Sequence, residues 1–200
     1  MQRIVLASSN PGKLKEFGAL LADSGYEVAP QTSLGVDDAE ETGLTFVENA
    51  LLKARHAARA TGLPALADDS GLCVDHLGGA PGLYSARYSG GHGDAAANNT
   101  KLLRALDGVP DAQRNAFFIA VLVLLRHAED PAPLIAEGRW YGRILTEGRG
   151  SGGFGYNPVF LPDGYTQSVA EMDDALKNRL SHRGQALALL RERLHELHWQ

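Results

Sequence analysis

The feature of this sequence that most constrains its fold is an uninterrupted apolar run, Ala116–Leu125. Phe, Ile and Val are frequent in it, and these residues favour strands. A run of this composition predicts a strand at the centre of a sheet rather than a surface helix. Its ten residues are well short of the roughly 18 that a membrane-spanning helix requires. The run therefore indicates a buried core, and no membrane partner is expected.

Segments on either side of this run alternate between strand and helix patterns. The expected strands are Arg3–Ala7, Glu27–Ala29, Ala65–Asp69, Leu72–Asp75, Leu134–Leu145 and Tyr156–Phe160, with a break at Ser70-Gly71. The expected helices are Leu14–Asp23, Thr45–Thr61, Asp94–Leu106, Ser168–Leu180 and Gln185–His198, the last two separated by Ser181–Gly184. Because strands and helices alternate early and strands cluster later, this order predicts an α/β fold with a mixed central sheet flanked by helices.

The composition is that of an ordinary acidic globular chain. Its 200 residues predict a single domain, residues 1–200, at most with a lobe-like elaboration. The net charge of −5 argues against a nucleic-acid polymer as partner, because such partners need a basic face, but a small anionic ligand remains possible. Cys73 is the single cysteine, and the apolar start Arg3–Ala7 is too short for a signal peptide. A soluble, cytoplasmic protein is expected.

The first candidate site is the polar loop between the first strand and the first helix. Its residues are Ser8, Ser9, Asn10, Pro11, Gly12 and Lys13. A helix N-terminus offers N–H groups and partial positive charge to an anion, and Lys13 adds a full charge. The alternative is a plain strand-to-helix turn capped by Ser or Asn. The loop lacks the G-x-x-x-x-G-K-[ST] pattern of the Walker motif.

Acidic residues form the second candidate site. The acids of Asp37–Glu41 have a simple alternative as solvated surface charges. Asp68 and Asp69 differ, because they end an apolar strand, where neighbouring like charges need compensation. Magnesium bound by carboxylates and phosphate oxygens is a common solution. Since side chains alternate along a strand, the two acids face opposite sides and only one is expected in the site.

Three further features remain open from the residues alone. Lys53 lies on a face of its helix that otherwise carries small or apolar residues, so its side chain either extends to the surface or points at an anion. The sequence Gly150-x-Gly152-x-x-Gly155 matches the dinucleotide fingerprint literally, but a strand-like run follows it where that fingerprint needs a helix. It is therefore interpreted as a flexible loop whose Phe154 and Tyr156 either stack on a base or are buried in a turn. The segment Lys177–Arg183 is either a basic helix end or a set of donors to substrate.

Together these motifs resemble one family over nearly the whole chain, the inosine triphosphate pyrophosphatases, and its bacterial branch most closely. The resemblance rests on Ser8–Lys13, Glu40–Phe46 with Glu48–Ala50 and Lys53–Arg55, Ala67–Gly71, Gly79–Gly82 with Tyr84–Arg87, Gly153–Pro158 and Ser181–Gly184. It implies a two-lobed, magnesium-dependent homodimer with its active site in the cleft between the lobes. The implied reaction is hydrolysis of ITP, dITP or XTP to the monophosphate and pyrophosphate, which removes damaged purines from the nucleotide pool.

The resemblance also assigns roles by position. Ser8, Ser9, Asn10, Pro11, Gly12, Lys13 and Lys53 would hold the triphosphate, with Ser70 beside the phosphates. Glu41 and Asp69 would bind Mg²⁺, and Asp69 would also be the base that prepares the attacking water. Phe154, Gly155, Tyr156 and Asn157 would wall the base, and Lys177, His182 and Arg183 would reach the substrate from the last helices.

A donor such as Arg183 aimed at the 6-oxo group of inosine or xanthine would be left unpaired against the amino group of adenine. One departure from the family pattern is Asn157, where the family usually has Asp, and it bears on base discrimination rather than on catalysis. Two alternatives to the implied function are a pyrophosphatase of other base specificity and a non-catalytic nucleotide-sensing module. The second would be expected to lack the acids Glu41 and Asp69.

Overall fold

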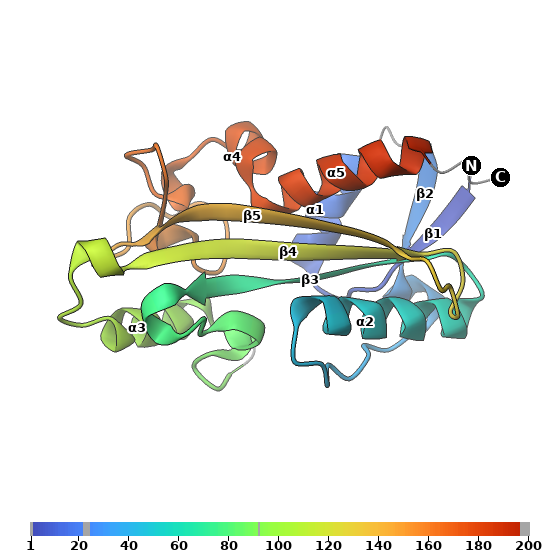
Figure 1. Ribbon diagram of the computed structural model, residues 1–200, viewed down its shortest axis with the longest axis horizontal. Helices are drawn as coiled ribbons and strands as arrows, with labels where there is room; N and C mark the ends of the chain where they lie inside the picture. Colours follow the sequence, from blue (N-terminus) through green and yellow to red (C-terminus); the bar gives the residue numbers. More distant parts are fainter. Residues whose placement is uncertain (1, 22–24, 92, 197–200) are drawn as a thin grey trace. The chain divides into compact units, whose positions relative to one another are not determined.

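The computed structural model describes residues 2–21, 25–91 and 93–196. Its strands are β1 (Gln2–Leu6), β2 (Tyr26–Pro30), β3 (Ala65–Val74), β4 (Asn115–Leu125), β5 (Leu134–Ile144) and β6 (Phe160–Pro162). Its α-helices are α1 (Pro11–Leu21), α2 (Phe46–Thr61), α3 (Ala95–Ala105), α4 (Asp174–Leu180) and α5 (His182–Glu196). The strands form one sheet in the order β2-β1-β3-β4-β5-β6 (Figure 1). β1 is parallel to β2 and β3, whereas β6 is antiparallel to β5, which confirms the predicted mixed α/β sheet.

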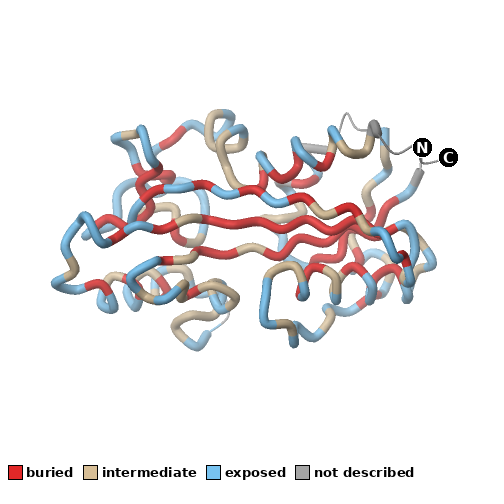
Figure 2. Tube along the Cα trace, viewed as in Figure 1, coloured by how far each residue is buried: buried red, intermediate tan, exposed pale blue. Residues whose placement is uncertain are grey.

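The long apolar run is a central strand, as predicted. β4 lies between β3 and β5, and its side chains from Ile119 to Leu125 are all buried. Figure 2 shows burial along most of β4 and β3, whereas the helices carry many exposed positions. A strand covered on both faces has no polar alternation, and this explains the uninterrupted apolar run.

The chain divides into two compact units. The first comprises Met1–Asp69, Ala120–Gly138 and Arg183–Gln200, and the second comprises Ser70–Ile119 and Arg139–His182. The prediction of one domain over residues 1–200, with its active site in a cleft, stays a prediction. No described helix is both long and apolar enough to cross a membrane.

In the first unit the sheet is covered on both faces. Ile4, Leu6 and Leu66 pack into one cluster with Phe17 of α1 and Leu187 of α5. Figure 1 shows α2 on the other face of the sheet from α5. Because side chains alternate along a strand, Asp68, two positions after Leu66, faces α1 and α5, and Asp69 faces α2. These two acids follow the apolar first part of β3.

Small residues and a cap fix the position of α2. The side chain of Thr45 accepts a hydrogen bond from the backbone N–H of Glu48, which satisfies one of the first N–H groups of the helix. Gly62 ends the helix in the left-handed conformation, with φ 69°. The buried face consists of Asn49, Ala50, Ala54, Ala57 and Ala58. Short side chains let this helix lie close to β1, so a long side chain from α2 can reach the middle of β3.

The second unit has its own core and a buried cation. Leu102 and Leu106, at the end of α3, pack in one cluster with Trp140 and Phe160. Arg114 is also buried, and its guanidinium donates to the carbonyl groups of Leu106, Ile144 and Leu145 at 2.7–2.8 Å. Arg114 therefore ties the end of α3 to the end of β5.

We expect Arg114→Met to lower the free energy of unfolding by at least about 2 kcal/mol, because buried carbonyl groups lose their donors. Urea denaturation would show this as a lower midpoint at unchanged slope. Arg143→Met is the control, since the Arg143 side chain is 46% exposed and a change within about 0.5 kcal/mol is expected there. Equal midpoints for the two variants would contradict a clamping role for Arg114.

Two predicted features of the strands are wrong. The break at Ser70-Gly71 is absent, and β3 continues from Ala65 to Val74. Gly71 is buried and has no positive φ, and the N–H of Leu72 beside it donates to Ser85 Oγ at 2.9 Å, so the strand continues through this pair. The expected strand Tyr156–Phe160 is mostly a 3₁₀ turn, Asn157–Val159, followed by β6. Pro158 has no N–H for a ladder, and the Val159 N–H donates back to the Tyr156 carbonyl.

The helix predictions near the C-terminus also need correction. Ser168–Leu180 is not one helix: a 3₁₀ turn with a capping box covers Val169–Glu171, and Asp173 then caps the shorter α4. Ser181 ends α4, but His182–Gly184 form the first turn of α5 instead of a linker. The last predicted residues of the first and final helices, at positions 22–23 and 197–198, lie outside the described residues.

Candidate active site

The polar loop after β1 forms the first part of the site. Asn10 caps α1, since its Oδ1 accepts from the N–H groups of Gly12 at 2.9 Å and Lys13 at 3.2 Å. The Asn10 N–H in turn donates to Ser8 Oγ at 3.2 Å. Pro11 begins the helix, a position where its missing N–H costs nothing. The capped-turn interpretation is thus confirmed locally, and the anion-binding role stays a prediction.

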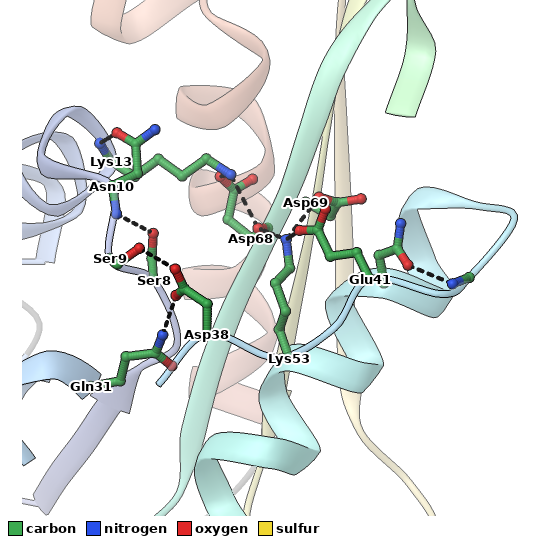
Figure 3. A network of polar contacts seen from close by, with 12 residues as sticks. Ser8, Ser9, Asn10, Lys13, Gln31, Asp38, Glu41, Lys53, Asp68 and Asp69 are labelled. Carbon is green, nitrogen blue, oxygen red and sulfur yellow. Dashed lines mark hydrogen bonds and ion pairs between the residues drawn. The ribbon is translucent and has the colours of Figure 1, made fainter. Parts of the chain in front are cut away.

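An acid outside the predicted set supports this loop. Ser9 Oγ donates to Asp38, and the Asp38 carboxylate also accepts from Gln31 Nε2 at 2.5 Å. Asp38 therefore links the loop to the segment after β2 (Figure 3). The sequence offered only a weak signal for this, because Asp38 lies in an acidic stretch that is also compatible with solvated surface charge.

Asp68 holds two cations on one face of the sheet. Its Oδ2 lies 2.9 Å from Lys13 Nζ and 3.1 Å from Arg183 Nε, and its side chain has 0% exposure. Burial alone would raise the pKa of Asp68, but Lys13 and Arg183 outweigh it and hold that pKa far below its usual range. Burial lowers the pKa of Lys13 more than Asp68 raises it. Asp68 is therefore ionised and forms a bridge between α1 and α5.

Asp69 and Glu41 share a lysine on the other face. Lys53 Nζ lies 2.7 Å from Asp69 Oδ1 and 2.9 Å from Glu41 Oε1. Burial opposes the charge on Lys53, but the two carboxylates raise its pKa above the usual value. Burial raises the pKa of Asp69 by more than Lys53 lowers it. The open question about Lys53 is thus answered, since it points at carboxylates inside the protein.

The main chain of β3 joins these two clusters (Figure 3). The backbone carbonyl of Asp68 accepts from Lys53 Nζ at 2.8 Å and from Lys13 Nζ at 3.3 Å. The register between β1 and β3 pairs Val5 with Ala65 and Leu6 with Leu66. β1 ends at Leu6, so no strand residue of β1 lies beside Asp68, and Lys13 and Lys53 can reach the Asp68 carbonyl. Ligands in open α/β sheets bind beyond such carboxyl ends of strands.

The two clusters carry opposite formal charge. Lys13 and Arg183 against one carboxylate, Asp68, give +1, whereas Lys53 against Glu41 and Asp69 gives −1. The first cluster attracts an anion and the second attracts a cation. The acids face opposite sides, as predicted, and Asp68 contacts two of the predicted substrate residues. The prediction that only one of the two acids enters the site stays a prediction.

One carboxylate oxygen of Asp69 is open to a further ligand. Asp69 Oδ2 is buried and has no hydrogen-bond partner among the described residues. Across residues 2–21, 25–91 and 93–196, no three His, Cys, Asp or Glu side chains gather as a metal site. A divalent cation held here by protein would have two carboxylates, Glu41 and Asp69. Magnesium commonly uses one or two carboxylates and completes its shell with phosphate oxygens and water.

The predicted base-wall residues lie in the second unit and differ in accessibility. Phe154 is 48% exposed, whereas Tyr156 is 4% exposed and its hydroxyl donates to the Ser85 carbonyl at 2.8 Å. The Gly155 carbonyl accepts from Asn99 Nδ2 at 3.0 Å. Asn157 lies so close to Gly153 that a Cβ there would meet its Nδ2 at 2.0 Å. Phe154 alone among the aromatics of this loop can offer a face to a base.

Contacts also tie down the glycine-rich loop that the sequence suggested was flexible. The Gly152 N–H donates to the Ala170 carbonyl at 3.0 Å, and Ser168 Oγ donates to the Arg149 carbonyl at 2.7 Å. A Cβ on Gly152 would meet the Ala170 oxygen at 2.6 Å. The glycines of this loop therefore permit close backbone packing.

The remaining predicted substrate residues of the second unit are placed as follows. Ser70 is half-buried on β3. Lys177 Nζ lies 2.6 Å from Asp174 Oδ1, and its side chain is 15% exposed. The His182 ring stacks on Phe118 at a centroid distance of 5.0 Å. The roles of these residues toward a nucleotide stay predictions.

An α/β sheet with charged clusters beyond a strand end is the arrangement in which proteins of this class bind ligands, phosphorylated ones included. The chain belongs to the Ham1 family, whose model matches residues 4–193. A dITP/XTP pyrophosphatase of Xanthomonas campestris is 65% identical over 197 residues, which is 98% of this chain and 99% of that protein. A dITP/XTP pyrophosphatase of Pectobacterium atrosepticum is 58% identical over 194 residues, 97% of this chain and 98% of that protein.

Solved structures agree with this assignment. A HAM1 protein from Coxiella burnetii has a TM-score of 0.92 and 50% identity, and the match covers 98% of this chain and 100% of that one. A nucleoside-triphosphatase described as a dITP/XTP pyrophosphatase from Mycobacterium abscessus has a TM-score of 0.78 and 45% identity, covering 94% and 98% of the two chains. The resemblance seen in the sequence motifs is confirmed.

Proposed function

We propose that this protein is a nucleoside triphosphate pyrophosphatase that hydrolyses deaminated purine nucleotides, ITP, dITP and XTP, to the monophosphate and pyrophosphate. The observation that carries this proposal is the pair of oppositely charged clusters joined at the Asp68 carbonyl (Figure 3). A triphosphate with a bound divalent cation presents both charges side by side. Relatives that match along nearly their whole length are named dITP/XTP pyrophosphatases, and this supports the same reaction.

Glu41 and Asp69 would hold Mg²⁺. Their oxygens are the hard ligands that this ion prefers, and the raised pKa of Asp69 shows that Lys53 compensates its burial incompletely. When bound, the ion would neutralise phosphate oxygens and so favour attack on phosphorus. Because only two carboxylates are present, we propose that magnesium is held jointly by protein and nucleotide.

The protein residues divide the chemistry between them. Asp69 would accept a proton from water as the water oxygen bonds to the α-phosphorus, and burial raises the pKa of Asp69 above its usual value. The bond from the α-phosphorus to the bridging oxygen breaks, and pyrophosphate departs with the electron pair. Lys13 and Lys53 would stabilise its developing charge. Ser8–Gly12 and Ser70 would hold the phosphates in line for this attack.

The base would be recognised by stacking on Phe154 and by donors of His182 and Arg183 at its 6-oxo edge, with Lys177 reaching the substrate from α4. Gly155, Tyr156 and Asn157 would complete the wall around the base. Tyr156 is itself buried, so it would support this wall rather than stack on the base. Guanine shares the 6-oxo group, so its rejection must depend on the 2-amino group. We also propose that the protein acts in the cytoplasm as a homodimer, as the family resemblance implies.

The test of this function is release of pyrophosphate from a panel of purine and pyrimidine triphosphates. Added inorganic pyrophosphatase converts the product to phosphate, which is measured with and without magnesium. We expect turnover of ITP, dITP and XTP to exceed that of ATP and GTP. Preference for a pyrimidine or for dUTP would instead indicate another base specificity on the same fold. Binding without turnover would indicate a nucleotide-sensing module.

Two substitutions separate stacking from hydrogen bonding at the base. Stacking tolerates any base and is worth roughly 1–3 kcal/mol, so Phe154→Ala should reduce kcat/KM for ITP, XTP, GTP and ATP alike. Arg183→Ala should reduce kcat/KM for ITP and XTP more than for ATP, so the preference for ITP and XTP over ATP becomes smaller. Equal losses for all four nucleotides in Arg183→Ala would assign this arginine to the phosphates and place base discrimination elsewhere, including at Asn157.

A further inference from the structure

The contacts of Asp68 are unusual for an acid that faces away from the proposed metal site. One oxygen, Oδ2, lies 2.9 Å from Lys13 Nζ and 3.1 Å from Arg183 Nε, although these residues come from opposite ends of the chain. The carboxylate side chain has 0% exposure, and the side chains of Lys13 and Arg183 are 15% and 7% exposed. Two cations are therefore held against a single buried oxygen.

This arrangement has a clear electrostatic consequence. Cations that share one oxygen are close enough to repel each other strongly where water is excluded. The Asp68 charge offsets that repulsion, and its removal would leave a pair of buried cations with formal charge +2. Breaking a buried ion pair from one side is costly because the remaining charge loses its compensation. A bound anion would supply the missing charge.

We propose that Asp68 is a positioning residue that acts as an internal counter-anion, holding Lys13 and Arg183 together in the nucleotide-free protein so that Lys13 is in place for a phosphate group, and Arg183 for the base, when the nucleotide arrives. It sets the charge of the cluster at +1, enough to attract an anion while keeping the empty site stable. The proposal rests on the proposed function for the identity of the anion, a phosphate of the nucleotide, and on the contacts above for the rest.

Asp68→Asn tests this directly, with inorganic pyrophosphate as the probe. The variant should melt at a lower temperature than the wild type, and saturating pyrophosphate without metal should raise its melting temperature by at least about 4 °C more than it raises that of the wild type. Its kcat for the preferred nucleotide should fall about tenfold or more, because the cations are less well oriented. KM should rise less than kcat falls, because the site keeps its cations.

The matched control is Asp130→Asn. Asp130 is 1% exposed and accepts from Arg126 Nη2 at 2.5 Å and Arg126 Nε at 2.8 Å, and its further donors are the backbone N–H groups of Arg126 and Ala132 in its own loop. A merely structural acid should behave as this one does, with a lower melting temperature, an unchanged pyrophosphate response and an unchanged kcat. If Asp68→Asn shows the same pattern as Asp130→Asn, the proposal is overturned.

A double variant removes one of the two cations together with the Asp68 charge. In Asp68→Asn/Arg183→Gln the cluster returns to one cation, so the melting temperature without pyrophosphate should recover toward the wild type and the extra response should disappear. A double variant less stable than Asp68→Asn would overturn the proposal. Should Asp68→Asn fail to fold, refolding with pyrophosphate should recover it but not a comparably unfolded control, and absence of recovery would again overturn it.

These measurements are separable from the proposed function. The melting-temperature response needs no turnover, so it can appear even if the wild type hydrolyses none of the nucleotides in the panel. Conversely, turnover of ITP with an unchanged pyrophosphate response in Asp68→Asn would retain the function and reject the counter-anion role.

Discussion

Asp69→Asn is expected to leave a folded protein whose activity is lower by at least about a hundredfold, the scale for loss of a positioned base. The amide keeps the size of the side chain and can still accept from Lys53, but it neither takes a proton from water nor offers a charged ligand to a cation. The loss should therefore appear in kcat, measured at saturating nucleotide and magnesium, with a near-normal melting temperature.

Binding of pyrophosphate serves as the control for this variant. The Lys13–Asp68–Arg183 cluster lies on the other face of β3 and does not include Asp69, so Asp69→Asn should bind pyrophosphate with close to wild-type affinity. A mild effect of Asp69→Asn together with a severe effect of Asp68→Asn would exchange the proposed roles of the two acids and refute the assignment of the base.

Withdrawal of magnesium is expected to abolish turnover without unfolding the protein. The described residues contain no cluster of His, Cys, Asp or Glu suited to a structural metal, and Lys53 already contacts both Glu41 and Asp69. The fold is therefore expected to persist without the ion, whereas the proposed reaction would need it at the phosphates. Activity with a chelator and thermal melts with and without it measure the two effects separately.

Glu41→Gln sharpens the test of the metal. If Glu41 binds the ion, the magnesium concentration for half-maximal rate should rise about tenfold or more, a scale on which groups around a metal change its affinity. Activity should recover at high magnesium, since Asp69 and the nucleotide remain. A large fall in melting temperature on chelation, in the absence of nucleotide, would show that the ion is also structural.

Local patterns predicted most of the elements. The apolar run Ala116–Leu125 gave the central strand, and the Thr45 cap with Gly62 bounded α2 as expected. Such signals depend on neighbours within one or two turns, so they are readable without knowledge of the fold. The errors occurred where a distant contact outweighed a local turn signal. Next to Gly71, the Leu72 N–H donates to Ser85 Oγ, and the Tyr156 hydroxyl donates to the Ser85 carbonyl.

The sequence by itself determined the class of fold, the family and the set of charged residues from which the site is built. Tertiary structure decided how those charges are paired, because Lys13 and Arg183 are 55 and 115 positions from Asp68. Alternation along β3 predicted that Asp68 and Asp69 point to opposite faces of the sheet, but not which helices pack on each face. Only packing of α1 and α5 on one side and α2 on the other divides the charges into one cluster that attracts anions and one that attracts cations. No local pattern encodes that division, since it depends on the register and ending of β1 beside β3.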